Sequence, residues 1–590
     1  MSAQARRRIG DLNVMVAGQG GDGSLTVVSL LGTLLGRRGF HLYTARDIAS
    51  RTKGGHAAGL LRASMEPRCT MGDRIDLLVA FDDEAIRRAG SKLAEDGIVV
   101  FDSSAGDVPP GRLPPGATLI AVPLARIAVR DLRQDLFKNS LGFGVVARVL
   151  GADDGEAAEI VGSRFRRGAE ELSAANLRAL ETGFSLAAAQ GFGPGSSPWQ
   201  LDRAERQERL FISGNEAIAL GFVAAGGRFY AGYPITPATE ILTTLAAQLP
   251  RFGGVAVQAE DELSAINMAI GAAMTGTRSM VASSGPGISL MQEGVSHAGS
   301  AEIPVVVVDC QRAGPSTGMP TKPEQGDINM LVHGGNGDFP RVVLTPGDLE
   351  DCFQLTVAAV NLAEQLQGPV YICLDQALGQ NSATVVPFDF DTVRVRTGRR
   401  LAAEDLATLP EYRRYAVTGD GISPLTFPGM RDGMSLITGN ERNDWGHVSS
   451  EAANRKVQMD KRMRKVEALL PDLPAGRRWG DPDAGVGLIG IGMEVGVMVE
   501  AEQQLRRAGV AVACLQPRTL WPVLRETLDF IASRERVYVI EHNAEGQLAH
   551  LLASVGAPRD RMSSILKYDG VPLLPSELAG LVMQAEEAVQ

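Results

Sequence analysis

Three segments of the 590-residue chain contain hydroxyl, carboxyl or guanidinium groups, and two of them combine these groups with glycine and proline, a mixture that suits the binding of a charged small molecule. The first is Gly232-Tyr-Pro-Ile-Thr-Pro237, which follows an expected strand and has prolines that hold the backbone extended. A hydroxyl on such a stiff loop, here that of Thr236, can be aimed at a ligand. Thr236 could equally be the N-cap of a helix that begins at Pro237. The residue types alone allow both.

The second segment, Glu260-Asp-Glu262, opens an expected helix that runs into Gly271. Acids in a first turn interact favourably with the helix dipole, which is the ordinary explanation for them. The helix itself is expected to be buried along one face, formed by Ile266, Ile270 and Ala273. A carboxyl group at the start of a buried helix can also be a catalytic acid, which makes Glu262 a candidate.

The third segment, Gln311-Arg-Ala-Gly-Pro-Ser-Thr-Gly-Met-Pro-Thr-Lys-Pro-Glu-Gln325, follows an expected strand directly. It holds one arginine, one lysine and three hydroxyls, and a shorter segment, Ser283-Ser-Gly-Pro-Gly287, precedes it. Open α/β sheets bind ligands at the carboxyl ends of their strands. The composition and position therefore favour a functional role.

A glycine-rich turn, Gly18-Gln-Gly-Gly-Asp-Gly23, follows the first expected strand and opens the first expected helix. Glycines let a backbone approach a phosphate, and a helix N-terminus favours an anion. A dinucleotide site also needs an acid at the end of the second strand. The nearest acid, Asp47, comes slightly late. NAD, another phosphate ligand and a purely structural turn all stay open.

A basic segment, Arg51-Thr-Lys-Gly-Gly-His56, lies downstream of that turn. Its two cations, Arg51 and Lys53, stand beside paired glycines, and such a loop suits contact with phosphate. The segment could also be an exposed basic loop without a ligand.

Strands that alternate with helices predict an α/β protein with parallel sheets and crossover connections. We expect three α/β domains at residues 10–190, 211–400 and 481–590. A linker at 191–210 joins the first two domains, and an irregular segment at 401–480 joins the last two. Within the linker, Leu201–Arg209 is a short helix or part of the connection. The expected strands are Asn13–Ala17, His41–Thr44, Ile75–Phe81, Gly97–Asp102, Thr118–Val122, Phe229–Gly232, Val255–Gln258, Ser279–Ala282, Val305–Asp309, Arg341–Leu344, Val370–Leu374, Val486–Ile491, Val510–Leu515 and Arg536–Glu541. A basic helix, Glu451–Leu469, is most simply a solvated surface.

Composition excludes several classes of protein. The formal charge of −11 argues against nucleic acid as the main partner. The chain has no apolar run of 18 residues and no secretory leader, so we expect a cytoplasmic protein that does not span a membrane. The five cysteines are scattered and odd in number, which is typical of reduced core thiols and leaves no plausible iron–sulfur ligand set.

Taken together, the segments around Thr236, Glu262 and Arg312 resemble the alpha subunit of 2-oxoacid:ferredoxin oxidoreductases. The segments Gly446-His-Val448, Asn454-Arg-Lys456, Lys461-Arg-Met-Arg-Lys465, Glu541-His-Asn543 and Gly546-Gln547 resemble later parts of that subunit. The domain with the glycine-rich turn is similar to the family's gamma subunit, here fused ahead of alpha. The resemblance covers nearly the whole chain and implies a Rossmann-like gamma domain, a thiamine-diphosphate pyrimidine-type domain and a transketolase C-terminal-like domain.

The resemblance implies a reaction in which a 2-oxoacid, coenzyme A and oxidised ferredoxin become acyl-CoA, carbon dioxide and reduced ferredoxin. It also implies a beta subunit that binds the diphosphate of thiamine diphosphate, Mg²⁺ and a 4Fe–4S cluster, in a dimer of heterodimers. Two Gly-Asp-Gly strings, Gly21–Gly23 and Gly419–Gly421, lack the asparagine that the diphosphate motif requires downstream. We therefore expect this chain to supply only half of an active site.

The resemblance also assigns roles to residues. Glu262 would bind the aminopyrimidine nitrogen N1′ of thiamine and favour the imino tautomer, while Thr236 and Arg312 would bind the carboxylate and oxo groups of the substrate. Thr317, Thr321 and Lys322 would lie near the rest of the substrate. Coenzyme A would contact the first domain through Gly18, Gly20, Gly21, Gly23, Arg51, Lys53, Gly54 and Gly55.

The segment at Arg312 resembles enzymes that act on 2-oxoglutarate or on a range of 2-oxoacids more than it resembles dedicated pyruvate enzymes. We expect 2-oxoglutarate as the substrate and succinyl-CoA as the product, with a broad 2-oxoacid or pyruvate enzyme as the alternative. An indolepyruvate-type enzyme and a non-catalytic Rossmann-type nucleotide-binding subunit also stay open as interpretations of the chain.

Overall fold

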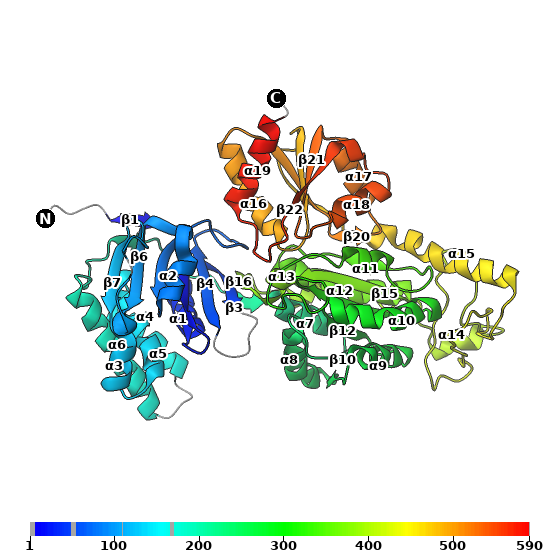
Figure 1. The fold of residues 1–590 in the computed structure, drawn as a ribbon. Coiled ribbons are helices and arrows are strands. Elements are labelled where there is room, and N and C mark those ends of the chain that lie inside the picture. The colour runs from blue at the N-terminus through cyan, green and yellow to red at the C-terminus, as the bar shows by residue number, and fades with distance from the viewer. Residues whose placement is uncertain (1–5, 49–54, 109, 166–169, 589–590) are drawn as a thin grey trace. The chain divides into compact units, whose positions relative to one another are not determined.

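The computed structural model describes residues 6–48, 55–108, 110–165 and 170–588. The chain forms two compact units (Figure 1). The first comprises Met1–Phe211 with Asn381–Pro387, and the second comprises Ile212–Gln380 with Phe388–Gln590. Among the described residues, no helix is both long and apolar enough to cross a membrane.

The first unit is built on a mixed β-sheet. Its strands are β2 (Asp11–Gln19), β3 (His41–Ile48), β4 (His56–Ser64), β5 (Ile75–Ala80), β6 (Leu93–Asp102), β7 (Thr118–Val122) and β16 (Ser382–Val385). They lie in the order β7-β6-β5-β2-β4-β3-β16, and β9 (Leu210–Ser213) follows β16 at the edge of the sheet. Strands β2, β5, β6 and β7 are parallel, whereas β4 is antiparallel to both β2 and β3. A small separate ladder pairs β1 (Arg7–Ile9) with β8 (Trp199–Leu201).

Helices cover both faces of this sheet. They are α1 (Ser24–Arg37), α2 (Asp83–Ala89), α3 (Leu124–Arg130), α4 (Lys138–Val149), α5 (Asp154–Phe165) and α6 (Glu170–Ala189). Buried side chains of α1, α4 and α5 share one core with the sheet, and those of α2 belong to a second core, on the alternate side chains of β2. Apolar residues that alternate along β2, such as Val14 and Met15, therefore enter different cores.

One expectation for this region is wrong, and one open alternative is decided. The sheet is not purely parallel, because β3 and β4 form an antiparallel pair that the strand–helix alternation did not indicate. As a result β3 does not lie beside β2, and Asp47 is not where a dinucleotide fold positions its ribose-binding acid. Residues 202–209 contain neither helix nor strand, so this segment is a connection and not a short helix.

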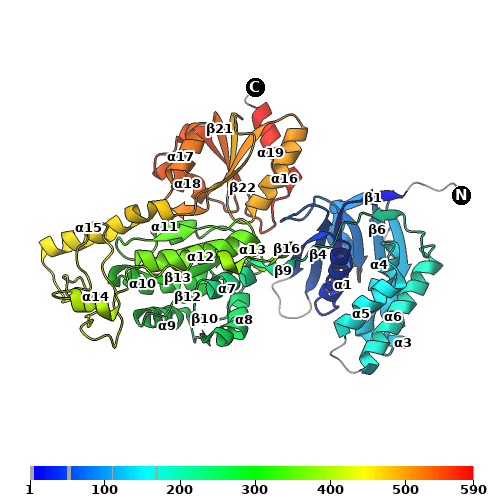
Figure 2. The same cartoon turned by 180° about the vertical axis from the view of Figure 1, so that it is seen from behind.

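The second unit contains a seven-stranded sheet, visible from both sides in Figures 1 and 2. Its strands are β10 (Phe229–Gly232), β11 (Val255–Gln258), β12 (Ser279–Ser283), β13 (Val305–Gln311), β14 (Val342–Leu344), β15 (Pro369–Asp375) and β20 (Thr519–Trp521). They lie in the order β11-β10-β12-β13-β15-β14-β20, all parallel except β20. The valine-rich stretches form these strands because a parallel sheet is buried on both faces.

The helices of this part are α7 (Gly214–Ala224), α8 (Thr239–Gln248), α9 (Glu262–Met274), α10 (Gly285–Ala301), α11 (Ile328–His333), α12 (Leu349–Leu366) and α13 (Gln376–Gln380). Helix α7 packs against α8 and α12, and α9 packs against α10. The apolar face of α9 formed by Ile266, Ile270 and Ala273 is buried, as its spacing predicts.

A second sheet of this unit has the order β17-β19-β18-β21-β22. Its strands are β17 (Arg477–Gly480), β18 (Val486–Gly490), β19 (Val512–Gln516), β21 (Arg536–Glu541) and β22 (Met562–Leu566). Its helices are α16 (Glu494–Arg507), α17 (Arg525–Ala532), α18 (Gln547–Ser554) and α19 (Pro575–Glu587). Strand β20 follows β19 in the chain but pairs with β14, which ties this part to the seven-stranded sheet.

The long segment between the two sheets contains α14 (Ala403–Thr408) and the basic helix α15 (Ala452–Leu469). The expectation that this basic helix is a solvated surface holds for one face of the helix but not for the opposite face. Lys461 and Lys465 are fully buried, and their Nζ atoms lie 2.7 and 2.5 Å from the two carboxylate oxygens of Glu302. Burial lowers the pKa of Lys465 to about 7, although the Glu302 charge opposes that shift.

Candidate functional site

The predicted site residues of the second unit follow the carboxyl ends of neighbouring strands. Thr236 lies in the loop after β10, Glu262 begins the helix after β11, and Arg312 follows β13. The strands β11, β10, β12 and β13 are consecutive in the parallel sheet, so their following loops meet at one edge. The structure thus brings together three residues that are 26 to 76 positions apart in the sequence, at the edge where such sheets bind ligands.

Glu262 is the first residue of α9 but not its cap. Asp261 caps the helix by accepting a 2.7 Å hydrogen bond from the backbone N–H of Ser264, and this bond lowers the pKa of Asp261. The side chain of Glu262 is only 5% exposed, and its Oε1 accepts a 3.2 Å hydrogen bond from the hydroxyl of Ser283. Because Asp261 performs the capping, the buried carboxyl group of Glu262 needs another explanation.

A glycine packs directly against that carboxyl group. A Cβ atom at Gly287, in the first turn of α10, would lie 2.5 Å from Oε1 of Glu262 and 2.0 Å from Oγ of Ser283. Any larger residue at Gly287 would displace both side chains. The segment Ser283–Gly287 therefore shapes the surroundings of Glu262, which agrees with its expected position at a strand end.

Thr236 is not an N-cap. Helix α8 begins at Thr239, and its N-cap position is Ala238, which has no side chain able to cap. The carbonyl oxygen of Thr236 instead accepts a 2.7 Å hydrogen bond from Nη1 of Arg312. The N-cap interpretation of Thr236 is therefore wrong, and the Thr236 backbone is fixed by another site residue.

Arg312 is a buried cation among carboxyl groups. Arg312 is only 8% exposed, and this burial lowers the pKa of its guanidinium group. The negative charges of Asp327 and Glu262 raise that pKa and so oppose the shift. The Nε of Arg312 is buried and has no hydrogen-bond partner within the described part of the chain. The guanidinium group can therefore accommodate a further acceptor, such as a ligand carboxylate.

The residues after Arg312 form a compact, exposed loop. The backbone N–H of Ala313 donates to the carbonyl of Lys322 at 2.9 Å, which closes the loop at its base. Thr317 lies in the exposed part of this loop, whereas Thr321 and Lys322 are half-buried at its base. A Cβ atom at Gly570, after β22, would lie 3.1 Å from Cβ of Lys322, so the base packs against the C-terminal part of the unit. The predicted set is thus divided between a buried group and an exposed loop.

Two buried aspartates near Arg312 were missed by the sequence analysis. Asp309 lies within the valine-rich strand β13 and is fully buried; burial, reinforced by the neighbouring charge of Asp327, raises its pKa strongly. Burial likewise raises the pKa of Asp327, to about 6, and a Cβ atom at Gly285 would lie 2.6 Å from its Oδ2. The one signal in the sequence was an acid that interrupts an apolar strand.

A polar network from the C-terminal sheet holds the segment that contains Asp327. The side chain of Gln547 donates to the carbonyl of Gly326 at 2.8 Å and accepts from the backbone N–H of Asn329 at 3.0 Å. The backbone N–H of Gln325 donates to the carbonyl of His542 at 2.7 Å. The Glu541-His-Asn and Gly546-Gln segments therefore contact the loop beyond the predicted site, and Gln325 is a member that the sequence analysis missed.

The glycine-rich turn of the first unit is held by its own aspartate. The carboxylate of Asp22 accepts from the backbone N–H of Gln19 at 2.8 Å and pairs with Nζ of Lys138 at 2.7 Å. Gly23, at the N-cap of α1, has a φ of 83°, and a Cβ atom there would lie 2.0 Å from Nδ2 of Asn139. Glycine is therefore required for packing, whether or not a phosphate also binds.

The other residues predicted to contact coenzyme A are only partly described. The backbone N–H of Gly20 donates to the carbonyl of Gly55 at 2.8 Å, which joins the turn to the end of the basic segment. Gly18 lies within β2, and Gly21 has a φ of 101° with open space beside it. Arg51, Lys53 and Gly54 lie outside the described residues.

Known protein families and relatives match this chain over most of its length. Residues 221–435 match the family model described as pyruvate flavodoxin/ferredoxin oxidoreductase, thiamine diphosphate-binding, and residues 13–186 match that of pyruvate ferredoxin/flavodoxin oxidoreductase. The chain is 31% identical to the 2-oxoacid:ferredoxin oxidoreductase subunit alpha of Sulfolobus sp, over 96% of both chains. It is 34% identical to the 2-oxoglutarate synthase subunit KorA of Methanothermobacter thermautotrophicus, over 64% of this chain and 99% of the relative.

The fold is also similar to a solved structure. The 2-oxoglutarate:ferredoxin oxidoreductase from Magnetococcus marinus, solved with 2-oxoglutarate, coenzyme A and succinyl-CoA bound, is 33% identical. It matches 98% of this chain and 99% of its own with a TM-score of 0.91. Fold and site thus define a subunit of an oxidoreductase with a thiamine-diphosphate-binding domain. The chain belongs to the family of 2-oxoacid:ferredoxin oxidoreductase alpha subunits, which confirms the resemblance and the predicted α/β fold class.

Proposed function

We propose that the chain is the gamma–alpha fused subunit of a 2-oxoglutarate:ferredoxin oxidoreductase. In the proposed reaction the bond from the oxo carbon to its carboxylate breaks and carbon dioxide leaves. The remaining acyl carbon is oxidised by two electrons, which reduce two ferredoxins with one-electron clusters, and it forms a thioester with the sulfur of coenzyme A with net release of one proton. The product is succinyl-CoA, and the enzyme can also run in the carboxylating direction.

The observation that carries the proposal is the buried carboxyl group of Glu262, which does not cap its own helix and lies beside Gly287. Thiamine diphosphate, when bound, supplies the carbanion chemistry that decarboxylation requires. The residues here fit that cofactor, because a buried carboxyl group that does not cap its own helix can hold a proton at Oε against a ring nitrogen. Ser283, which donates to Oε1, keeps the carboxyl group oriented.

The substrate would bind through Thr236 and Arg312. Arg312 holds the backbone of Thr236, and its buried Nε offers a donor to the carboxylate and oxo groups of a 2-oxoacid. 2-Oxoglutarate brings a second carboxylate, which is costly to bury without a partner. Lys322 would supply that partner, with Thr317 and Thr321 in the same loop. The backbone carbonyl of Lys322 accepts a hydrogen bond from the N–H of Ala313, which keeps Lys322 close to Arg312. The relatives named 2-oxoglutarate synthase support this choice over pyruvate.

Coenzyme A would bind to the first unit, through the turn at Gly18, Gly20, Gly21 and Gly23 and through Arg51, Lys53, Gly54 and Gly55. The solved relative with coenzyme A and succinyl-CoA bound supports a coenzyme A-dependent reaction. The backbone link between Gly20 and Gly55 supports treating the turn and the basic segment as one region.

A beta subunit would supply the remaining groups, namely the diphosphate site, Mg²⁺ and the 4Fe–4S cluster. Among the described residues no group of three or more His, Cys, Asp or Glu side chains could hold a metal ion. Four of the five cysteines are buried and all five are free thiols. We propose a cytoplasmic dimer of heterodimers that reduces ferredoxin.

The test is to co-purify the chain with its native beta partner and to screen 2-oxoacids for coenzyme A-dependent dye reduction, with the isolated chain as control. We expect 2-oxoglutarate to give the highest kcat/KM and the isolated chain to be colourless and inactive. A higher kcat/KM for pyruvate would show that 2-oxoglutarate is not the preferred substrate. Stoichiometric iron in the isolated chain would contradict the division of cofactors, and a complex without activity on any 2-oxoacid would favour a non-catalytic binding subunit.

A further inference from the structure

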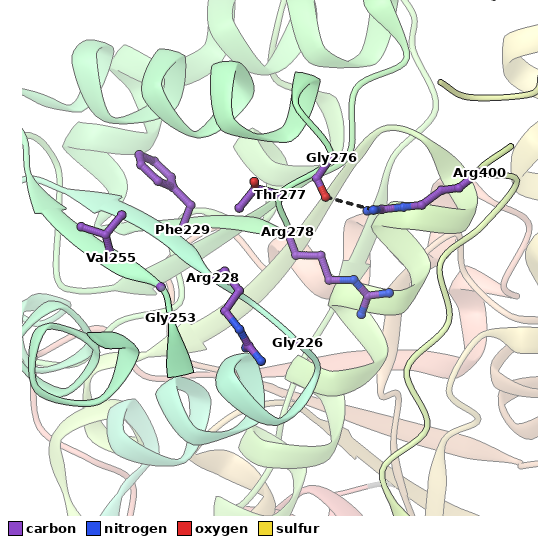
Figure 3. Close-up of a pocket in the computed structure, with 10 residues that line it drawn as sticks. Gly226, Arg228, Phe229, Gly253, Val255, Gly276, Thr277, Arg278 and Arg400 are labelled. Carbon is purple, nitrogen blue, oxygen red and sulfur yellow. Dashed lines mark hydrogen bonds between the residues drawn. The ribbon is translucent and has the colours of Figure 1, made fainter. Parts of the chain in front are cut away.

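A polar cavity of about 600 Å³ opens at the edge of the seven-stranded sheet opposite the candidate active site (Figure 3). It lies where β10, β11 and β12 begin, whereas Thr236 and Glu262 follow the ends of β10 and β11. Three arginines line it, Arg228, Arg278 and Arg400, together with four glycines and two apolar side chains. Its position therefore separates it from the substrate site, and no step of the proposed reaction requires it.

The buried arginine of this cavity has no carboxylate of its own. Arg278 is 7% exposed, and its guanidinium group donates to the backbone carbonyls of Ala225 and Arg396. Within the described part of the chain, no carboxylate oxygen lies within 4.0 Å of it. A buried cation that is bonded only to neutral groups keeps an unbalanced charge, and such a charge favours the binding of an anion.

The other two arginines do not remove that imbalance. Arg400 pairs with the buried Glu364 at 2.6 Å and donates to the carbonyl of Gly276 at 2.9 Å. Arg228 donates to the neighbouring carbonyl of Gly227 at 2.7 Å. Three guanidinium groups and one carboxylate leave a formal charge of +2 around the cavity.

The arginines are close enough to affect one another. Burial lowers the pKa of Arg278; the charge of Glu364 opposes this shift, and the charges of Arg400 and Arg228 add to it. In Figure 3 the side chain of Arg278 extends between those of Arg228 and Arg400. Mutual repulsion of this kind is relieved by a ligand that carries negative charge, and guanidinium groups match phosphate oxygens in geometry.

The remaining wall of the cavity is apolar and open. Phe229 and Val255 lie on the side away from the three arginines in Figure 3, and Val255 is 48% exposed. A Cβ atom at Gly253 would have no heavy atom within 4 Å, so the cavity is open to solvent beside Gly253. The volume is within the range of about 300–1,000 Å³ that small-molecule sites occupy.

We propose that this pocket binds a small organic phosphomonoester, with its dianionic phosphate on Arg228, Arg278 and Arg400 and its organic part against Phe229 and Val255. A phosphate dianion balances the formal +2 charge, and an apolar or aromatic group covers the open wall. The site is independent of the proposed enzymatic function, because its ligand would be neither a substrate nor a cofactor of that reaction.

The experiment measures binding to the full chain in its native complex by calorimetry, with inorganic phosphate, AMP and adenosine as probes. We expect phosphate and AMP to bind, AMP more tightly, and adenosine not to bind. Arg228→Met should weaken AMP binding by about 10-fold or more, since a charged hydrogen bond contributes roughly 1.5–3 kcal/mol. Arg228 bonds only to carbonyls of nearby residues in the chain, so we expect this variant to fold and to retain 2-oxoacid turnover.

Arg251→Met is the matched control, because Arg251 is exposed on the neighbouring turn, donates to Gln248 and does not line the cavity. Equal affinity for phosphate and AMP would overturn the proposed contact of the ligand's organic part with Phe229 and Val255. AMP binding that Arg228→Met leaves unchanged would assign the ligand to another site, such as the first unit. Failure of both phosphate and AMP to bind at millimolar concentration, or equal weakening by Arg251→Met, would overturn the proposal as a whole.

Discussion

The two edges of the seven-stranded sheet differ in how their charges are balanced. At the carboxyl edge one buried arginine, Arg312, lies within electrostatic range of the carboxyl groups of Glu262 and Asp327. At the amino edge three arginines share one carboxylate, that of Glu364. The first arrangement has excess carboxyl groups, which can hold protons; the second has excess fixed cations, which can only attract an anion. Proton handling is therefore expected at the carboxyl edge alone.

The largest effect that tests this difference is expected from Glu262→Gln. An amide cannot exchange a proton with a ring nitrogen as a carboxyl group does, and acid–base groups contribute about 10²–10⁴-fold to rate. We expect kcat of the assembled complex to fall by that factor while the subunits still associate. Glu260→Gln is the control, because Glu260 is exposed and lies outside the helix. Turnover of Glu262→Gln within about tenfold of the native enzyme would reduce Glu262 to a packing role.

Arg312→Met tests the anion-binding part of the same edge. Loss of a charged hydrogen bond of roughly 1.5–3 kcal/mol should lower kcat/KM for 2-oxoglutarate and for pyruvate alike, by about 10–150-fold. The expected readout is a rise in KM for both substrates, because both carry the carboxylate next to the oxo group. Arg228→Met, at the opposite edge, is the matched arginine control and should leave both values unchanged. A fall caused by both variants would mean that the edges are not independent.

Asp327→Asn tests whether the carboxyl edge holds surplus negative charge. The pKa of Asp327 is raised from 3.8 to about 6, so the folded chain binds more protons than the unfolded chain between these values. The free energy of unfolding therefore falls as pH rises from about 4 to about 6, by an amount of about 1–3 kcal/mol.

The asparagine cannot ionise, so the variant should lose this decline and gain stability relative to the native chain above pH 6. Thermal midpoints of the full chain at pH 5 and pH 7 measure the change. Asp338→Asn, which removes an exposed carboxylate shortly before β14, is the control and should have no such effect. An unchanged pH dependence in Asp327→Asn would assign the change in protonation to Asp309, whose pKa is also raised by burial.

Local patterns in the sequence predicted much of the fold. The strands at Thr118–Val122, Phe229–Gly232, Val255–Gln258 and Arg536–Glu541 have the expected bounds, because parallel strands are short, largely apolar runs between clear breaks. The β3–β4 pair was missed, since β4 follows the Gly54-Gly55 segment that is typical of a loop. The predicted domain boundaries stay predictions.

Long-range pairing accounts for the other differences. One face of the basic helix α15 is buried because Lys461 and Lys465 meet Glu302, about 160 positions earlier in the chain, and no local pattern records such a pair. In the site, Thr236, Glu262 and Arg312 could be predicted because motifs carry them. Gln325 and Asp327 could not, since their positions depend on Gln547 and its neighbours in a different sheet.

The smallest expected effect belongs to Lys322→Met, which concerns specificity and not catalysis. Lys322 lies at the half-buried base of the loop after Arg312, and its backbone carbonyl accepts from the N–H of Ala313. A cation there can meet the second carboxylate of 2-oxoglutarate, which pyruvate lacks. Partial exposure screens this interaction, so we expect about a tenfold loss of kcat/KM for 2-oxoglutarate, the lower end of the range for a charged hydrogen bond.

The ratio of kcat/KM for the two substrates separates this role from a structural one. If Lys322 acts on the second carboxylate, Lys322→Met lowers the ratio of 2-oxoglutarate to pyruvate, and Lys322→Arg, which keeps the charge, restores most of it. If the side chain only packs against Gly570, both substrates lose equally and arginine gives no recovery. An equal loss would transfer recognition of the second carboxylate to the beta subunit, and the carboxyl edge of this chain would then serve any 2-oxoacid without preference.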